Sequence, residues 1–505
     1  MSKESLSNSP SHVEETDPTP QAETAIEYDS NGLSGIVRSP YVLGAATLAS
    51  LGGFSFGYAP GHPRYGFNVG FMTGMLELGA FVGCLFLPYL ADRISRKWAM
   101  TVATVFFTIG AIIQTAAHNY GTLVAGRAIG GIGVGTLAMG APLYISEISP
   151  PNLRGSLLVL EALSIVIGAI ISYWITYGTK DMASEWSFRL PFLLQMPPAL
   201  LVGLGIHFFP YSPRWLVMRQ RDDDSLHALA QLRRVPATDD RVQAEWKGIL
   251  TEVRFQQEIL SQEHPNDSGI ILELKQWGDL FRPRCLKRTA VALGIPFFQQ
   301  FSGINAFVYY APTFFKALGQ DDNMALILSG MVNICQLAAG IPTFLYLDKM
   351  GRRKLAIFGG AAMAVPHLIM SGVVGKFDGK WEANPGMGWF GVALILFPSS
   401  RRAKGVGAAT AMVWLANFII GVVVPEMIIK IGWGTYLFFG IFCSLASIFS
   451  FFLVPETANK SLEQISQLFG DHAVADEEAV YERIRHQVWA GHAHGAEHAE
   501  VKQSI

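Results

Sequence analysis

A group of amides lies in one apolar segment of the second half of the chain. Gln299, Gln300 and Asn305 fall inside an apolar run near 289–318. Each amide offers hydrogen-bond donors and an acceptor, so these side chains suit a ligand rich in hydroxyl groups. On a regular helix, Gln300 and Asn305 lie about 100° and 240° around the axis from Gln299. One straight face cannot hold all three, so either the ligand is wrapped or the helix is broken near Gly303. Hydrogen bonding between helices is the alternative role.

Charged side chains gather at the ends of the apolar runs. Cations and carboxylates at helix ends can hydrogen-bond with one another and complement helix dipoles. Their alternative role is to set the topology alone, because Lys and Arg favour the cytoplasmic side. Arg127 differs from these end residues because it falls near the start of an apolar run. We expect a charge in such a run to face a cavity. The charged residues at the predicted cytoplasmic ends include Asp92, Arg93, Arg96, Glu147, Arg154, Arg352 and Arg353.

The composition indicates a membrane protein. Of the 505 residues, 50% are hydrophobic and 15% are charged. A soluble globular domain carries about 25% charged residues. The net charge of -2 gives no basic field, so no nucleic-acid partner is expected. The chain has 4 cysteines, too few for a disulfide framework.

Apolar runs long enough to cross a bilayer divide the chain. A bilayer core about 30 Å thick needs about 20 apolar residues as helix. Six predicted spans precede a polar interval and five clear spans follow it, at 41–58, 67–90, 98–117, 121–145, 157–177, 189–210, 289–318, 324–347, 355–375, 403–428 and 433–454. We expect a disordered cytoplasmic tail at 1–38, a six-helix bundle at 39–210, a cytoplasmic loop with short helices at 211–288, a second bundle at 289–454 and a cytoplasmic tail at 455–505.

The second half contains one interval that is too short to hold a full membrane span. The two halves repeat one another weakly, since the charged run beginning at Asp92 corresponds to the run beginning at Asp348. The charge pattern requires a crossing before Arg401. After the polar stretch 376–385, only 386–397 remain for it, which is 12 residues and rises about 18 Å as helix. The tenth span is therefore predicted to be truncated.

Several short motifs stand in order at the boundaries of the predicted spans. In the first half they are Asp92-Arg93 with Arg96-Lys97, Gly126-Arg127, Tyr144 to Glu147 with Arg154-Gly155, and Ser212-Pro213-Arg214. In the second half they are Gln299 to Asn305, Asp348 to Arg353, and Pro455-Glu456-Thr457. In this order the motifs resemble the sugar porter family of the major facilitator superfamily, and in particular its fungal-type monosaccharide transporters, over roughly 40–470.

The resemblance implies an all-α polytopic fold of two six-helix pseudo-repeat bundles, which rock around a central site and carry a hexose or pentose. It implies a monomer in the plasma membrane, within the lipid bilayer, with both termini cytoplasmic and with protons as a candidate second substrate. It implies no enzyme activity, cofactor or metal. The implied positions are Gln299, Gln300, Asn305, Asn333, Trp414 and Asn417 for sugar contacts, Tyr309 and Tyr310 for the outer gate, and the seven charged residues above for a cytoplasmic latch.

Some positions depart from the family pattern. Ala59 stands where the first span would carry an acid, and a buried acid is the expected group for taking up and releasing a proton. Its absence argues against ordinary proton symport. Tyr211 replaces the usual Glu before Ser212, and Ile395 aligns with Glu147 of the first half. Two alternatives to a transporter are a sugar sensor that does not transport, and a truncated gene model or splice product with impaired transport.

Overall fold

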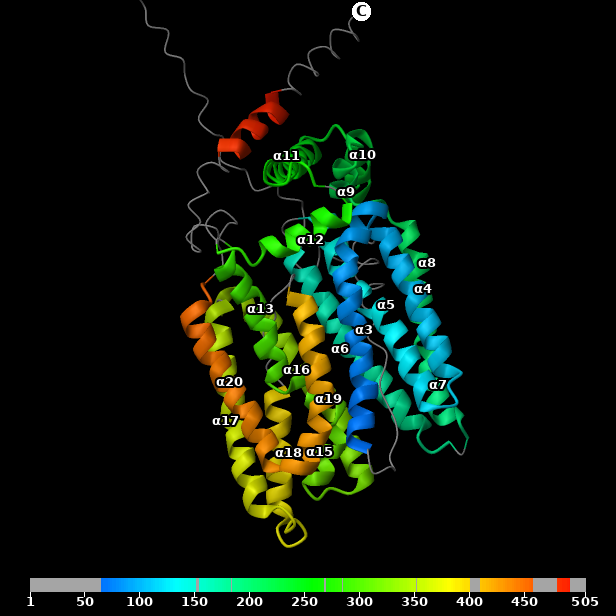
Figure 1. The fold of residues 1–505 in the computed structure, drawn as a ribbon, viewed down its shortest axis with the longest axis vertical. Helices are drawn as coiled ribbons and strands as arrows, with labels where there is room; N and C mark the ends of the chain where they lie inside the picture. Colours follow the sequence, from blue (N-terminus) through cyan, green and yellow to red (C-terminus); the bar gives the residue numbers. More distant parts are fainter. Residues whose placement is uncertain are drawn as a thin grey trace, which may run out of the picture.

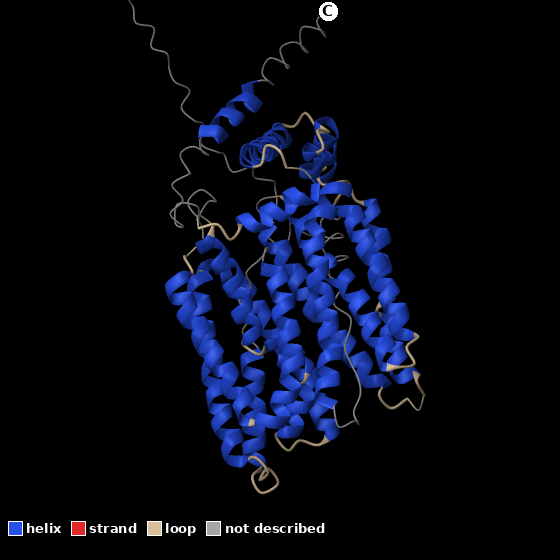
Figure 2. Cartoon of the chain, in the orientation of Figure 1, coloured by secondary structure: helices blue, strands red, loops and turns tan. Residues whose placement is uncertain are grey.

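The computed structural model describes residues 65–150, 154–182, 184–267, 269–283, 285–350, 352–399, 409–456 and 479–490. Every regular element in these ranges is a helix (Figure 2). Nine of the described helices are long and apolar enough to cross a bilayer, and shorter apolar helices accompany them at Ser164–Thr179 and Pro385–Leu396. The predicted all-α membrane fold is confirmed, while the predicted span 41–58 lies outside the described residues.

The helices of the first half follow the predicted spans with one exception. The predicted span 189–210 is divided near Gln195, because Pro197 and Pro198 stand at the first positions of a new helix and Pro cannot continue a helical hydrogen-bond ladder. The helices are α3 (Tyr65–Ile94), α4 (Arg96–Thr115), α5 (Tyr120–Ile148), α6 (Arg154–Thr179), α7 (Trp186–Leu194) and α8 (Met196–Gly205), followed by the short η2 (Ile206–Phe208).

In the second half the predicted run 289–318 is divided into three helices. The tenth span is described as a helix of 15 residues, which rise about 22 Å, and it reaches the edge of the described residues at Ser399, so the predicted truncation stays a prediction. The helices are α13 (Leu286–Phe301), α14 (Ile304–Tyr309), α15 (Ala311–Ala317), α16 (Asp322–Met350), α17 (Arg352–Phe377), α18 (Pro385–Ser399), α19 (Ala409–Ile431) and α20 (Trp433–Leu453).

Helix α3 packs against α5 of its own half on one side and against α19 of the other half on the other (Figure 1). Glycines permit both approaches. A methyl group at Gly79 would lie 2.2 Å from the Ala128 carbonyl oxygen of α5. A methyl group at Gly70 would lie 2.7 Å from the Val422 carbonyl oxygen of α19. Small residues let helix backbones approach closely.

The predicted polar loop folds into short helices at one end of the bundle (Figure 1). They are α9 (Pro213–Met218), α10 (Asp222–Arg233), α11 (Asp240–Glu263) and α12 (Gly269–Asp279). Trp246 and Leu250 of α11 form a small apolar core with Leu229 of α10. A further helix at 479–490 adds Ile484 and Val488 to this core. The composition predicts only a polar tail at 455–505 and does not indicate this helix.

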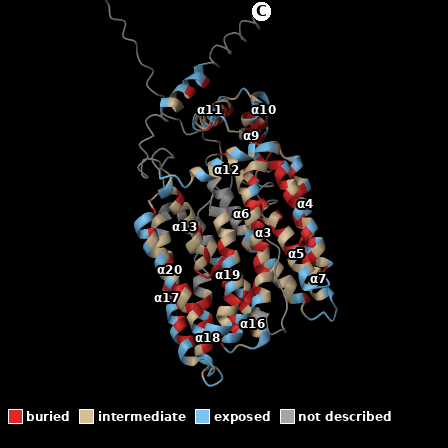
Figure 3. Cartoon of the chain, in the orientation of Figure 1, coloured by how far each residue is buried: buried red, intermediate tan, exposed pale blue. Residues whose placement is uncertain are grey.

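Buried positions concentrate where the long helices face one another, and exposed apolar positions cover the outward faces (Figure 3). Phe86, Phe106, Ile171 and Phe452 are examples of large exposed apolar side chains on the long helices. A soluble protein would expose a surface of this kind only at an interaction site, whereas a bilayer covers it entirely. The distribution therefore supports a polytopic membrane protein.

Candidate functional site

A network of buried amides joins two helices of the second half. Asn305, in the first turn of α14, donates from Nδ2 to Gln300 Oε1 and to Asn417 Oδ1, both at 2.6 Å. Gln300 lies in the last turn of α13, and Asn417 lies in α19. All three side chains are buried. The structure thus brings together three of the predicted amides, which supply the donors and acceptors that hydroxyl groups require.

The contact between Gln300 and Asn305 depends on a break in the backbone at Gly303. Gly303 has φ +85 and separates α13 from α14. Glycine adopts this left-handed region without the steric cost that a side chain would add. A methyl group there would also lie 2.8 Å from the Phe439 ring. The predicted break near Gly303 is confirmed, and the alternative of hydrogen bonding between helices is also present, in the bond between Asn305 and Asn417.

A carboxylate from the first half extends the network. Glu77 of α3 is 0% exposed. Its Oε1 accepts a hydrogen bond from the Tyr309 hydroxyl at 2.7 Å, and its Oε2 accepts one from Asn417 Nδ2 at 3.1 Å. Asn417 Nδ2 also donates to the Tyr309 hydroxyl oxygen at 3.2 Å. Glu77 is not among the predicted site residues, although a single acid inside an apolar run is itself a signal of function.

The other predicted contact residues lie around this network. The Tyr310 hydroxyl donates to a backbone carbonyl of α19 at 2.6 Å. Asn333 of α16 is buried, Gln299 is half-buried, and Trp414 of α19 lies beside α3. Within the described residues, no hydrogen bond joins the side chains of Gln299, Asn333 or Trp414 to the amide network. These three positions therefore stay predictions from the resemblance.

Arg127 of α5 lies near Glu77 of α3. Its side chain is buried, and Nε donates to the Met72 carbonyl oxygen at 2.8 Å. Arg127 also interacts electrostatically with Glu77. A buried cation and a buried carboxylate thus face each other between α3 and α5, next to Tyr309 of the second half.

Three of the predicted latch residues form one cluster in the first half. Arg96 makes ion pairs with Asp92 at 2.7 Å and with Glu147 at 2.9 Å. The side chains of Arg96 and Glu147 are only 6% and 5% exposed. Arg93 is close by and exposed, and its carbonyl accepts a hydrogen bond from Arg219. The cluster ties the ends of α3, α4 and α5 together.

Helix α12 crosses near this cluster and adds a carboxylate to it. Burial and the neighbouring charge of Asp92 raise the pKa of the Glu273 carboxyl above its usual value. Two like charges near each other and partly removed from water disfavour the ionised state. The ionised state of Glu273 is therefore disfavoured where α12 lies close to Asp92.

Arg353 is the predicted latch residue of the second half whose side chain the structure describes, and its hydrogen bonds stay within that half. The Arg353 amide donates to Glu456 Oε2 at 3.3 Å, and Nη2 donates to the Phe451 carbonyl oxygen at 2.6 Å. The side chains of Arg154 and Arg352 lie outside the described residues. Ile395 is buried in the apolar core, at the position that aligns with Glu147.

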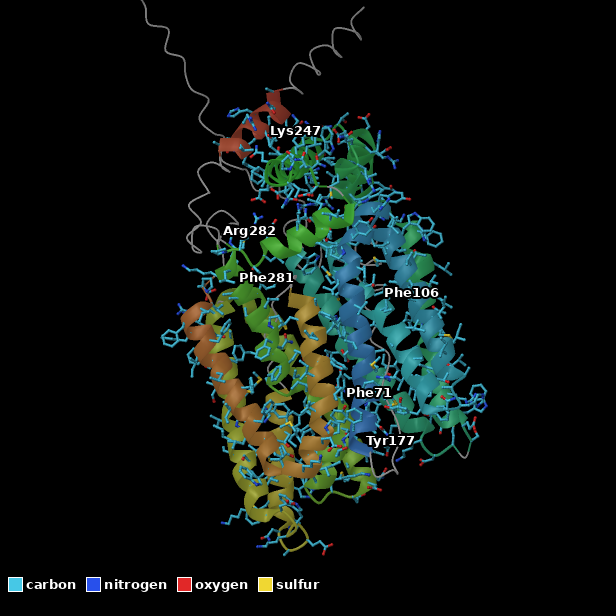
Figure 4. All side chains as sticks on the ribbon, viewed as in Figure 1. Phe71, Phe106, Tyr177, Lys247, Phe281 and Arg282 are labelled. Atoms are coloured by element: carbon cyan, nitrogen blue, oxygen red, sulfur yellow. The ribbon has the colours of Figure 1, made fainter. Side chains whose placement is uncertain are left out.

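Hydrogen bonds between the halves also occur at the end of the bundle opposite the loop helices. The Tyr177 hydroxyl of α6 and Nζ of Lys180, just after α6, donate to Asn323 Oδ1 of α16 at 3.0 and 2.7 Å. The Tyr173 hydroxyl donates to the Leu326 carbonyl oxygen at 2.6 Å. Figure 4 shows Tyr177 at this end and Lys247 of α11 at the other. The two halves are thus joined at the end remote from the latch residues.

Tyr211 takes a new role at the position where the family pattern has Glu. Lys97 is buried and donates from Nζ to the Phe209 carbonyl oxygen at 2.5 Å. Its ammonium group lies 4.5 Å from the centroid of the Tyr211 ring. A cation over an aromatic face is attracted by the ring quadrupole, so Tyr211 offers Lys97 a partner without a carboxylate.

Comparisons with known proteins agree with the motifs. The family model described as "Sugar (and other) transporter" matches residues 62–469. The chain is 30% identical over 450 residues to a high-affinity glucose transporter of Kluyveromyces lactis, covering 82% of this chain and 79% of that protein. It is 32% identical over 425 residues to a probable quinate permease of Aspergillus niger, covering 78% of this chain and 77% of that protein.

Solved structures show the same fold. The proton:xylose symporter XylE bound to 6-bromo-6-deoxy-D-glucose has a TM-score of 0.66 and 24% identity, covering 85% of this chain and 99% of that one. The partially occluded inward-open XylE from E. coli has a TM-score of 0.62 and 22% identity, covering 85% and 98%. The chain belongs to the sugar (and other) transporter family and has the major facilitator fold.

Proposed function

We propose that the protein carries a monosaccharide, a hexose or a pentose, across a membrane by alternating access. The observation that carries this proposal is the buried network of Gln300, Asn305 and Asn417, which meets Glu77 of the other half. Amides bind hydroxyl groups by donating and accepting, and they add no charge that a neutral sugar would have to match. No covalent chemistry is required, so the protein is not an enzyme.

Alternating access requires that the two halves move relative to each other. The contacts of Tyr177 and Lys180 with Asn323 would close the end remote from the loop helices. In this conformation the Arg96 cluster and Arg353 bond within their own halves. Pairing of these cytoplasmic residues across the halves would close the opposite end. We therefore assign 39–210 and 289–454 as the two rocking bundles, with Tyr309 and Tyr310 as the gate.

The cellular setting follows from the same proposal. The positive charges at 93–97 and 352–354 stand at the end of the bundle where the loop helices lie. Placing them in the cytoplasm puts both termini and the loop at 211–288 there. We propose a monomer in the plasma membrane. Glucose is the first substrate to test, because it appears in the names of several similar proteins.

The test is uptake of labelled D-glucose and D-xylose in a yeast that lacks its own hexose transporters. We expect uptake by the full chain and loss of most of it in Gln300→Ala, since Gln300 is at the centre of the site. Unchanged uptake in Gln300→Ala would contradict the site. Binding of the sugar to the purified protein without uptake would instead indicate a sensor.

A further inference from the structure

Glu77 has the properties of a group that binds a proton. It is the acid of an apolar helix, in the run Met75-Leu76-Glu77-Leu78, and its side chain is 0% exposed. A carboxylate in this setting is costly, and such residues commonly mark ion or proton pathways. At position 59, where the first span would supply an acid, the chain has Ala.

The charged and titratable groups around Glu77 come from both halves. Arg127 of α5 faces it electrostatically from the first half. Tyr309 of the second half donates to its Oε1 at 2.7 Å, and Tyr310 also interacts with it electrostatically. The remaining polar contact is Asn417 of α19 at 3.1 Å from Oε2. Glu77 is thus a polar contact between α3 and the site helices of the other half.

We propose that Glu77 carries the coupling proton of sugar transport in place of an acid in the first span. Both of its oxygens accept hydrogen bonds from donors of the second half. A proton on Oε1 can be met by reversal of the Tyr309 hydroxyl, so the coupling proton is assigned to Oε2, where it turns the oxygen into a donor that the Asn417 amide nitrogen cannot accept from. Asn417 Nδ2 must then move away, and protonation weakens the link between the halves at this point.

The same proton changes the state of the sugar site. Asn417 Oδ1 accepts from Asn305, and Asn305 in turn donates to Gln300. When Glu77 is protonated, Asn417 Nδ2 is released and can donate to a sugar hydroxyl. By linkage, a sugar that engages Asn417 changes the affinity of Glu77 for its proton by the same factor. This inference rests on the proposed function and adds a proton and the residue that binds it.

The experiment uses the full chain reconstituted in liposomes that contain a pH-sensitive dye. Counterflow, the exchange of labelled for unlabelled D-glucose or D-xylose, measures sugar movement without net proton flow. In the wild type we expect counterflow, sugar-dependent acidification of the lumen, and accumulation of sugar driven by an inward proton gradient. In Glu77→Gln we expect counterflow to persist, acidification to be lost, and gradient-driven accumulation to fall at least about fivefold, the lower range of coupling energies.

Two further variants make the result specific. Glu426→Gln removes an acid of α19 whose ion pair with Lys430 lies away from the network, and it should keep proton movement. Glu77→Asp restores an acid whose side chain is one methylene shorter, and it should recover part of the proton movement. This recovery tests the role of the acid even where Glu77→Gln is poorly folded. Acidification that survives in Glu77→Gln would overturn the role of Glu77. Wild-type counterflow without acidification would overturn proton coupling and leave sugar transport intact, whereas absence of counterflow with both sugars would overturn both proposals.

Discussion

Asn417 of α19 donates a hydrogen bond at 3.1 Å to Glu77 of α3, a residue 340 positions earlier in the chain. The bond joins the two halves of the transporter at the amides of the proposed sugar site. Because Asn417 also accepts from Asn305 at 2.6 Å, it holds a donor and an acceptor in fixed positions. Its loss should therefore affect binding and the contact between the halves together.

Replacement of Asn417 by Ala should weaken sugar binding. The change leaves Asn305 and Glu77 each without one hydrogen-bond partner, and a buried unsatisfied group costs about 1–3 kcal/mol. We expect a rise in the sugar Kd of about 5–150-fold, measured by binding of labelled D-glucose to the purified protein. Asn384→Ala is the control, since the Asn384 side chain donates to the Lys380 carbonyl oxygen in an outer connection. Equal Kd values for both variants would exclude Asn417 from the site.

A larger side chain at Gly74 should push the halves apart. A methyl group there would lie 2.9 Å from the side chains of Phe418 and Val422 of α19. Overpacking of this kind costs about 1–3 kcal/mol and should disfavour the conformation in which α3 and α19 meet. We expect Gly74→Leu to lengthen the distance between spin labels at positions 181 and 322, which flank the contact of α6 with α16.

The spin-label experiment needs a matched control and a clean background. Gly372→Leu is the control, because no atom lies within 4 Å of a methyl group at that position. Cys285 and Cys335, the two less buried cysteines, are replaced by Ser to prevent their labelling. An unchanged distance distribution in Gly74→Leu would mean that α3 and α19 do not separate when the bundle opens.

Arg96→Ala should destabilise the first half. The substitution leaves the buried Glu147 carboxylate without its cation, and breaking a buried pair in this way costs about 3–5 kcal/mol. We expect a marked fall in Tm in detergent. Arg189→Ala removes an ion pair with Glu185, whose side chain is 69% exposed, and should cost less than about 1 kcal/mol. A similar fall in both variants would mean that the Arg96 cluster contributes no more than a surface pair.

The contact of α12 with α3 should strengthen as the pH falls. The pKa of Glu273 is raised by burial and by Asp92, so the ionised form is disfavoured in the docked state. The resulting penalty is full above the raised pKa and disappears as the pH falls towards about 4.3, the ordinary value of Glu. Hydrogen exchange of 269–279, corrected for intrinsic rates, should slow between pH 7 and 5 in the wild type. Glu273→Gln should be protected at both pH values, whereas Glu263→Gln, at an exposed position, should behave as the wild type.

A charge at Val488 should detach the helix at 479–490 from the loop helices. Val488 is 1% exposed in the core around Trp246. An unpaired carboxylate cannot remain in that core, so the helix should open more often and expose Arg483 and Arg485 to trypsin. We expect cleavage at these sites to accelerate strongly in Val488→Asp. Gln487→Asp, on the exposed face, should be cleaved at the wild-type rate.

Local chemistry made part of the site predictable. The angular spacing of Gln299, Gln300 and Asn305 required a broken helix or a wrapped ligand, and a break is present at Gly303. The contact of Asn305 with Asn417 spans 112 positions of sequence. The resemblance assigned both positions to sugar contacts but did not predict their hydrogen bond, because no local pattern relates two helices that are distant in the chain.

Glu77 and the helix at 479–490 show where prediction from sequence failed. The importance of Glu77 comes from partners on α14 and α19, and these contacts exist only once the two halves have packed together. The 479–490 segment alternates apolar and charged residues, and its helix is stabilised by a core that the loop helices supply. In both cases the stabilising contacts are tertiary, so secondary-structure propensity and composition predict them poorly.

The truncated tenth span that the sequence predicts, of which α18 is the described part with 15 residues, has a consequence for the surrounding lipid. A helix of this length rises about 22 Å, against a hydrocarbon core of about 30 Å. For α18 to cross with both ends in water, the bilayer beside it must become thinner, at a cost of fractions of a kcal/mol for each Å of mismatch. The acyl chain length of the lipid would then change the stability of this transporter. Short-chain lipids would stabilise the second half, and long-chain lipids would oppose its insertion.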